Sequence, residues 1–248
     1  MLGIKAKHGD LGYFDIPKCA SSTLKNVFLE LDYGTDALKN NKKKLTAHEF
    51  YQRRKENIDN CEIRLLIIRE PIYRFISAYQ NRVHIHKELS SQHLENSTIS
   101  NDRRGIPEPS LKYFIENFEV YNKVDTIKWH TQPICNLIKC DLDYFTHIYK
   151  MSQLEECSKL ISHLYNKEII FKKRQTSGPG KPLLSDLSRT HLNKLIEYYR
   201  DDYELLNGYF SIDSIIEEWK KDAVIGPVAK LFNIFQRRKK QSKRRRKN

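Results

Sequence analysis

The chain has 248 residues, of which 39% are hydrophobic, 11% aromatic and 30% charged. This length and composition suit a folded domain with a full core and exclude a chain that is disordered throughout. Secretion and membrane spanning are disfavoured, because no apolar run approaches the ~18 residues of a membrane helix and the first residues lack the features of a signal peptide.

Most of the net charge of +13 comes from the C-terminal end of the chain. Residues 227–248 hold ten of the 44 Lys and Arg residues and no acid, which leaves 34 basic against 31 acidic residues over 1–226. We therefore expect one domain over 1–226 and a basic, disordered tail over 227–248. Such a tail is typical of a solvated segment, and it would also contact polyanions or an anionic membrane surface non-specifically.

The cysteines favour a cytoplasmic protein without disulfides. They are an odd number, five, and none forms a C-x-x-C pair. His84 and His86 alternate on an expected helix and have no cysteine pair nearby, so no metal site is predicted.

Two short apolar segments predict buried strands that each lead into a helix. Residues 12–16 are aromatic and β-branched and stop at Pro17, and residues 63–68 (IRLLII) form the clearest buried strand. The hydroxyl residues 21–23 supply N-cap groups for the first helix, and Pro71 suits the first turn of the second. Strands that each feed a helix indicate an α/β fold with a parallel central sheet flanked by helices.

The rest of the chain predicts further helices, a third strand and polar loops. Residues 88–109 are typical of a surface loop or lid, and the strand expected over 169–171 precedes a basic, glycine-rich loop over 172–181. Helical periodicity returns in three segments, 111–118, 151–164 and 192–206.

The first segment with chemical potential is PKCASST, over residues 17–23, after the first strand. Ligands of parallel sheets bind beyond the carboxyl ends of the strands. Small residues at a helix N-terminus leave backbone N–H groups for an anion, and Lys18 adds a positive charge. The segment lacks the glycines of the usual P-loop, so by itself it fits a capped helix equally well.

The second segment is REPIYRFISAY, over residues 69–79, after the strand of 63–68. Arg69 stands at the strand end, and Arg74 and Ser77 share a helix face because they are three residues apart. An arginine fork and a serine hydroxyl suit a terminal phosphate, although a surface arginine beside a helix-interior serine would give the same pattern.

Together, IPKCASST and LLIIREPIYRFISAY resemble the sulfotransferases that use 3′-phosphoadenosine 5′-phosphosulfate (PAPS), and more narrowly the carbohydrate sulfotransferases of family 2. The resemblance spans roughly residues 12–210 and implies a P-loop-like sulfotransferase fold. It places the 5′-phosphosulfate of PAPS on the first segment and the 3′-phosphate on the second. The implied donor-binding residues are Lys18, Cys19, Ala20, Ser21, Ser22, Thr23, Arg69 and Ser77, with Arg174 and Thr176 from the basic loop.

The resemblance also gives candidates for the catalytic groups. Lys18 would neutralise the charge that builds on the bridging oxygen, and a base would take the proton of the acceptor hydroxyl. His48 lies 21 residues before Arg69, as in heparan sulfate 2-O-sulfotransferases, and is the favoured base. His130, in a disturbed version of the family's H-W-x-P-Q segment, is the alternative base or an acceptor contact, and Glu49 is a third candidate.

Three other functions are compatible with parts of the sequence. Cys19 at a helix N-terminus suggests a cysteine-dependent phosphatase, but the arginine expected six residues later is Lys25. A nucleic-acid-binding protein acting through the tail of 227–248 would lose binding steeply with salt. A sulfotransferase homologue that only binds nucleotide would be indifferent to the loss of its base.

The resemblance implies PAPS as donor, no metal, and a hydroxyl acceptor that belongs to a glycan or glycoconjugate. Animal relatives are Golgi membrane proteins with an N-terminal anchor, whereas this chain begins about ten residues before its first expected strand. We therefore expect a cytoplasmic protein, or a Golgi-luminal one if the chain is a trimmed animal homologue. The closing segment YYRDDYELL, over 198–206, resembles a packing helix of the family.

Overall fold

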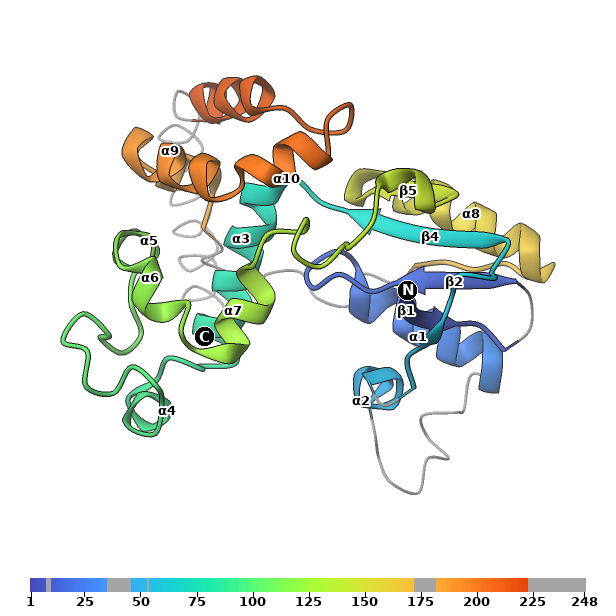
Figure 1. The fold of residues 1–248 in the computed structure, drawn as a ribbon, viewed down its shortest axis with the longest axis horizontal. Helices are drawn as coiled ribbons and strands as arrows, with labels where there is room; N and C mark the ends of the chain where they lie inside the picture. Colours follow the sequence, from blue (N-terminus) through green and yellow to red (C-terminus); the bar gives the residue numbers. More distant parts are fainter. Residues whose placement is uncertain (8–9, 35–45, 53, 172–181, 223–248) are drawn as a thin grey trace, which may run out of the picture.

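The structure is a computed structural model that describes residues 1–7, 10–34, 46–52, 54–171 and 182–222 (Figure 1). Its sheet has the order β3-β1-β2-β4-β5. The strands are β1 (Leu2–Lys5), β2 (Leu11–Phe14), β3 (Glu56–Asn57), β4 (Ile63–Ile68) and β5 (His147–Lys150). β2, β4 and β5 run parallel, and β1 is antiparallel to both β2 and β3. The predicted α/β fold with parallel strands is confirmed, and β1 and β3 add an antiparallel edge.

The helices form two groups beside and around this sheet (Figure 1). Those that accompany the sheet are α1 (Ser21–Tyr33), α2 (Ala47–Gln52) and α8 (Leu154–Tyr165). The second group, which we call the helical lobe, contains α3 (Pro71–Tyr79), the π-helix η1 (Gln80–Ile85), α4 (Ser91–Glu95), α5 (Leu111–Glu116), α6 (Phe118–Tyr121), α7 (Asp125–Thr131), α9 (Arg189–Tyr198), α10 (Arg200–Leu205) and a helix over 212–222. Short 3₁₀ turns lie at Leu142–Tyr144, Met151–Gln153 and Leu184–Asp186. None of the described helices has the length and apolarity needed to cross a membrane.

Each group has its own core. The sheet core joins residues of β2, β4, α1 and α8, such as Tyr13, Phe28 and Leu66. The helical core is rich in aromatic rings, with Phe75 of α3 packed against Phe114, Phe118 and Tyr199 at centroid distances of 5.7, 5.2 and 6.3 Å. Because α3 follows β4 directly, the polar residues at the β4–α3 junction lie between the two cores.

The third parallel strand is not where the sequence predicted it. Residues 169–171 are not a strand, and β5, which pairs with β4, is formed by His147–Lys150. Ile169 instead exchanges hydrogen bonds with serine hydroxyls of α8: its N–H donates to Ser162 Oγ at 2.9 Å, and its carbonyl accepts from Ser158 Oγ. Ile170 is 68% exposed, so this apolar run follows α8 on the surface.

Two local predictions are also corrected. The α1 helix starts at Ser21 with Ala20 as its N-cap residue, and no side chain caps it, so residues 21–23 do not act as N-caps. The segment 88–109 contains α4 and buries Leu89, Leu94 and Ile99 in the helical core. It is therefore attached to the helical lobe by apolar packing and is not a polar lid.

Candidate functional site

The loop between β2 and α1 has a strained backbone. Lys18 and Ala20 have φ values of 69° and 56°, a left-handed conformation that costs a non-glycine residue roughly 1–2 kcal/mol. Both flank Cys19 in the turn that leads into α1. Strain of this kind persists only where the surroundings impose it, and it concentrates at ligand sites.

This turn presents backbone N–H groups at the start of α1. Thr23 N–H donates to the Ala20 carbonyl at 2.9 Å, whereas the N–H groups of Ser21 and Ser22 precede the first carbonyl that α1 can offer them. A left-handed turn followed by a helix N-terminus forms a concave group of donors that suits an anion. The small side chains of residues 20–22 leave room for it.

Buried polar contacts hold the β2–α1 loop against the strand and the helix that it connects. Asp15, at the end of β2, forms an ion pair with Lys25 of α1 at 2.6 Å, and both side chains are nearly inaccessible. The hydroxyl of Tyr13 donates to the Cys19 carbonyl at 3.3 Å. The loop is therefore anchored to both elements that it connects.

Cys19 is part of the sheet core, with no exposed surface. Burial raises the pKa of its thiol to about 11, the opposite of what a nucleophilic cysteine needs. This geometry argues against the cysteine-dependent phosphatase. It also leaves only the backbone of Cys19 for contact with a ligand.

The end of β4 meets the same loop. Arg69 follows Ile68, and its Nη1 donates to the Lys18 carbonyl at 3.3 Å. The adjacent, parallel strands β2 and β4 thus bring the two sequence motifs together at one edge of the sheet. Ser77 is half-buried, two turns into α3.

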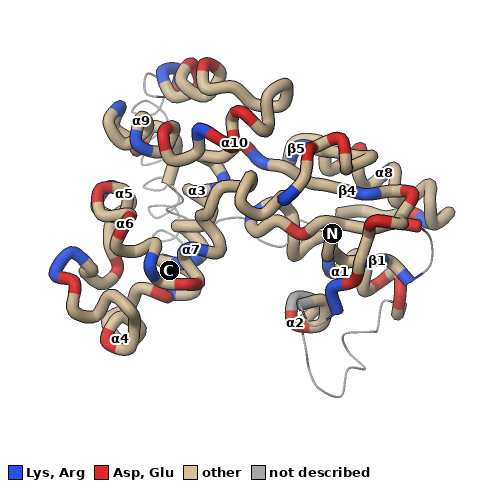
Figure 2. The backbone as a smooth tube through the Cα atoms, in the orientation of Figure 1, with Lys and Arg blue, Asp and Glu red and all other residues tan. Residues whose placement is uncertain are grey.

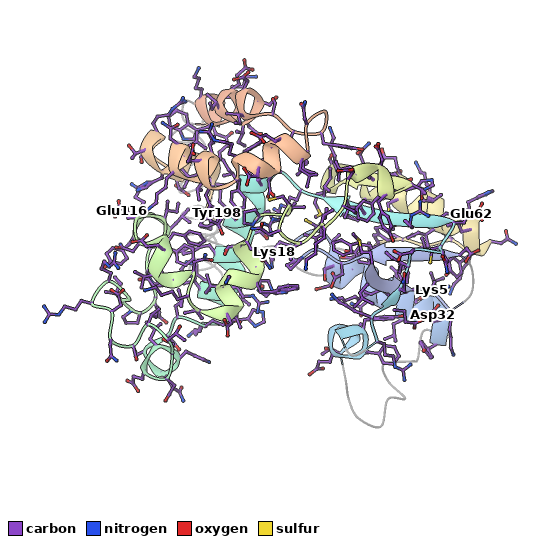
Figure 3. All side chains as sticks on the ribbon, viewed as in Figure 1. Lys5, Lys18, Asp32, Glu62, Glu116 and Tyr198 are labelled. Atoms are coloured by element: carbon purple, nitrogen blue, oxygen red, sulfur yellow. The ribbon has the colours of Figure 1, made fainter. Side chains whose placement is uncertain are left out.

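Lys18 lies where the sheet and the helical lobe meet (Figure 3). Burial, followed by the charges of the Arg82 and Arg69 guanidinium groups, lowers the pKa of Lys18 to about 8, while Cys19 and Glu88 act in the opposite direction. Basic and acidic residues are interspersed over both lobes (Figure 2), so this positive centre is local. Several positive groups around one partly buried site favour an anionic ligand.

A cavity of about 700 Å³ opens at the carboxyl ends of β4 and β5. Arg69 and Lys150, the residues at those strand ends, both line it. The aromatic side chains of Tyr73, Tyr209 and Phe210 form part of its wall, with polar groups from residues 207–218. Its volume is in the range of small-molecule sites, and Arg69 connects it to the β2–α1 loop.

Arg74 has a structural role. It is fully buried, and its guanidinium donates to the carbonyls of His130 at 3.2 Å, Thr131 at 3.5 Å and Gln132. The ring of Tyr199 lies below it, 5.6 Å from the guanidinium carbon. The proposed phosphate pair of Arg74 and Ser77 is therefore wrong for Arg74, whose fork ties α7 to α3.

The candidate bases lie in different surroundings. His130 Nδ1 donates to the Thr126 carbonyl at 2.7 Å, so a neutral ring carries its lone pair on Nε2, the atom a base would use. Glu49 accepts from the N–H and hydroxyl of Thr46, both at 2.8 Å, and thus caps the start of α2.

His48 belongs to α2, and its side chain is outside the described residues. The described contacts of α2 include the sheet core, through Ala47 and Tyr51, and the C-terminal end of α1, where Tyr51 donates to Asp32 at 3.3 Å and Phe50 packs on Tyr33. That end is roughly 18 Å from the N-terminus of α1 at 1.5 Å per residue. The role of His48 as base stays a prediction.

Arg174, Thr176 and the tail of 227–248 also lie outside the described residues. In the part of the chain that is described, no three metal-ligating side chains lie together.

Sequence reasoning missed three ionisable residues that interact electrostatically with Lys18, namely Arg82, His86 and Glu88. They follow α3, on and after the π-helix η1, and Arg82 pairs with Glu88 at 2.7 Å. Burial and the charge of Arg82 hold the pKa of His86 below its usual value. The sequence feature that could have pointed to Arg82 is its position five residues after Ser77, along the same helical segment.

A profile described as Sulfotransferase family matches residues 4–210, a range that includes the β2–α1 loop, α3 and α10. The comparisons with curated proteins and with solved structures return no match.

Proposed function

The chain belongs to the sulfotransferase family, and we propose that it moves the sulfuryl group of PAPS to a hydroxyl of a carbohydrate. Membership of the family implies sulfuryl transfer, and its enzymes typically take the group from PAPS. The carbohydrate acceptor rests on the resemblance of the two sequence motifs to carbohydrate sulfotransferases.

One observation carries the proposal: Arg69 joins two places that suit the two ends of PAPS. Its guanidinium touches the β2–α1 loop at the Lys18 carbonyl, and it also lines the cavity at the ends of β4 and β5. The loop offers backbone N–H groups and a lysine for the 5′-phosphosulfate. The cavity offers aromatic walls and cations for a phosphorylated nucleoside.

The residues present therefore fit PAPS. The N–H groups of residues 20–22 would hold the 5′-phosphate, and Arg69 with Ser77 would hold the 3′-phosphate. PAPS supplies the sulfuryl group, whose bond to the bridging phosphate oxygen breaks as its bond to the acceptor oxygen forms.

Lys18 has the main electrostatic role in this mechanism. Its ammonium group, held at the loop by a strained backbone, would neutralise the negative charge on the bridging oxygen. Because it is partly buried, its charge is screened less than that of a surface lysine. A base would receive the proton of the acceptor hydroxyl, and we propose His48 for this role with Nε2 of His130 as the alternative.

The acceptor class is tested with ³⁵S-labelled PAPS and a set of unsulfated polysaccharides. We expect label in at least one polysaccharide, and loss of about 10²–10³-fold in turnover for Lys18→Ala. Lys159→Ala, which removes an exposed lysine from α8, is the matched control and should leave turnover unchanged. Transfer to small phenols or to protein alone, with no label in any polysaccharide, would overturn the carbohydrate proposal.

A further inference from the structure

One wall of the cavity at the ends of β4 and β5 comes from the helix over 212–222. Ser211, just before the helix, and Ser214, Ile215 and Glu218 within it all line the cavity. Their spacing of three or four residues puts them on one helix face. The family profile ends at residue 210, so this wall lies outside the range that it matches. The helix therefore adds side chains to the site that family membership does not account for.

This helix is firmly attached to the helical lobe. Ile215 is 2% exposed and belongs to the helical core, and the indole N–H of Trp219 donates to the Leu187 carbonyl at 2.9 Å. The guanidinium carbon of Arg189 lies 5.6 Å from the ring of Trp219. The cavity wall is thus a fixed part of the fold and can hold a side chain in a defined position.

The side chain of Glu218 is held in place by α3. The hydroxyl of Tyr73, which also lines the cavity, donates to Glu218 Oε1 at 2.6 Å. Within the described residues, no hydrogen bond reaches the second oxygen, Oε2. A carboxylate that is fixed through one oxygen keeps the other as an acceptor for a ligand.

The other carboxylate of the cavity, Glu70, has a different role. Its Oε2 accepts from the Tyr73 N–H at 2.7 Å, and its Oε1 accepts from the hydroxyl of Tyr203. Both of its oxygens are therefore used inside the protein, and the residue caps α3. Among the described residues that line this cavity, Glu218 is thus the acid with an oxygen available to a ligand.

The charged groups of the cavity come from different elements. Arg69 and Lys150 stand at the ends of β4 and β5, whereas Glu218 belongs to the helix over 212–222. Phe210, on the segment that leads into this helix, has its ring 5.7 Å from the Lys150 ammonium group. Cations from the strands, an aromatic wall and a separate acceptor suit a ligand with an anionic group, a planar ring and a hydrogen-bond donor.

The chemistry of PAPS limits the group that Glu218 can bind. Outside its phosphate and sulfate groups, PAPS has two hydrogen-bond donors, the 6-amino group of adenine and the 2′-hydroxyl of the ribose. The 2′-hydroxyl is adjacent to the 3′-phosphate, so a carboxylate bound there would stand beside a second anion. The amino group lies on the side of the base away from the ribose, where a carboxylate meets less repulsion. The amino group is therefore the better partner for Glu218.

We propose that Glu218 is a specificity-determining residue whose Oε2 accepts a hydrogen bond from the 6-amino group of adenine, and that Tyr73 is a positioning residue that holds this carboxylate. The inference rests on the proposed function, because it assumes that the cavity holds the nucleoside of PAPS. A base with an oxygen in place of the amino group would present an acceptor to the carboxylate and would bind less tightly.

The test compares calorimetric binding of the desulfated product, 3′-phosphoadenosine 5′-phosphate (PAP), with that of 3′-phosphoinosine 5′-phosphate. We expect wild-type protein to bind PAP at least about tenfold more tightly, the value of one hydrogen bond to a charged group. In Glu218→Gln the preference should fall to about twofold or less, because the amide can donate to the oxygen of hypoxanthine. Glu217→Gln, one position earlier on the helix and outside the cavity lining, is the matched control and should keep the wild-type preference.

Two results from Glu218→Gln would overturn the inference. Equal weakening of both nucleotides would place the carboxylate on the 2′-hydroxyl, which they share, and an unchanged preference would remove Glu218 from recognition of the base. If wild-type protein does not bind PAP, the proposed function itself fails. If it binds PAP but shows no preference over the inosine nucleotide, only the role of Glu218 fails.

Tyr73→Phe tests the positioning role separately. The ring stays in the cavity wall but loses the hydroxyl that fixes Oε1, so we expect the preference for PAP to fall by a smaller factor than in Glu218→Gln. The double variant should show the same preference as Glu218→Gln alone, because Tyr73 acts through Glu218. A further loss of preference in the double variant would contradict this role.

Discussion

The edge of the sheet and the interior of the helical lobe both contain cationic and hydroxyl side chains, but the two regions differ in how completely these polar atoms are hydrogen-bonded. In the helical lobe, Arg74 is fully buried and donates to three consecutive carbonyls. At the sheet edge, Arg69 makes one long hydrogen bond to a loop carbonyl and lines a cavity. The two arginines are five residues apart in one motif, so their residue type does not reveal their roles.

The backbone shows the same contrast. The β2–α1 loop places Lys18 and Ala20 in left-handed conformations, and within the described residues the N–H groups of Ser21 and Ser22 have no hydrogen-bond partner at the start of α1. By contrast, α3 begins with Glu70 accepting from the Tyr73 N–H at 2.7 Å and with Pro71 in its first turn, so its start is fully capped. Unpaired donors and strain indicate a ligand site, whereas satisfied donors indicate packing.

Replacing Arg74 gives the largest expected effect. Arg74→Met keeps the volume but takes the guanidinium donor away from the carbonyls of His130 and Gln132, while Thr131 keeps the Tyr199 hydroxyl as donor, so we expect the free energy of unfolding to fall by about 3–5 kcal/mol. Urea denaturation measures the loss, and Arg69→Met, with a change below about 1 kcal/mol, is the control. A stable Arg74→Met protein that has lost nucleotide binding would reverse the assignment of the two arginines.

Arg69→Ala tests the other side of the comparison. Removing a guanidinium that holds a phosphate should weaken PAP by about 30–100-fold, or about 2–3 kcal/mol. Circular dichroism should show an unchanged fold. Unaltered PAP affinity would show that the end of β4 does not bind the 3′-phosphate.

Glu70, between the two arginines, gives a pH-dependent effect on stability. Burial raises the pKa of Glu70 from 4.5 to about 7. A carboxyl group with a raised pKa in the folded state binds its proton more tightly there, so this group destabilises the protein as pH rises from about 5 to 7. The free energy of unfolding of Glu70→Gln, relative to wild type, should therefore rise on the order of 2 kcal/mol over that window. Parallel pH curves for the two proteins would contradict this role.

Ala20→Gly and Ala78→Gly give the smallest effect and opposite signs. Glycine relieves the positive φ of Ala20, so this variant should be as stable as wild type or more stable by about 1 kcal/mol. The same change inside α3, at Ala78, should destabilise the protein by about 1 kcal/mol. Thermal unfolding of both variants checks the pair, and equal losses would show that the loop is not strained.

The sequence predicted the part of the site that depends on neighbouring strands. Residues 63–68 and Pro71 have strong local signals, and the parallel pairing of β2 and β4 followed from them. β5 was missed because His147–Lys150 is short and half-buried along its length, so its periodicity is weak. The apolar run at Ile169 predicted a strand, but the backbone N–H of Ile169 bonds to a serine hydroxyl of α8 instead of to a neighbouring strand. No local pattern reveals this tertiary contact.

The roles of the basic residues depended on long-range contacts and were not predictable. Arg74 makes its hydrogen bonds more than fifty residues away, and Arg82 pairs with Glu88 across a π-turn that no local pattern reveals. By contrast, the positions of Lys18 and Arg69 follow directly from the ends of β2 and β4. A strand end constrains a side chain locally, whereas the interior of a helix leaves its partner to the tertiary fold.

The most direct test of the donor site is calorimetric titration of the wild-type protein with PAP, 5′-AMP and 3′-AMP. Each monophosphate occupies one of the two anion sites, and PAP occupies both. We predict micromolar binding of PAP and much weaker binding of either monophosphate. Equal binding of all three, or no binding of PAP, would contradict a site built from the β2–α1 loop and Arg69.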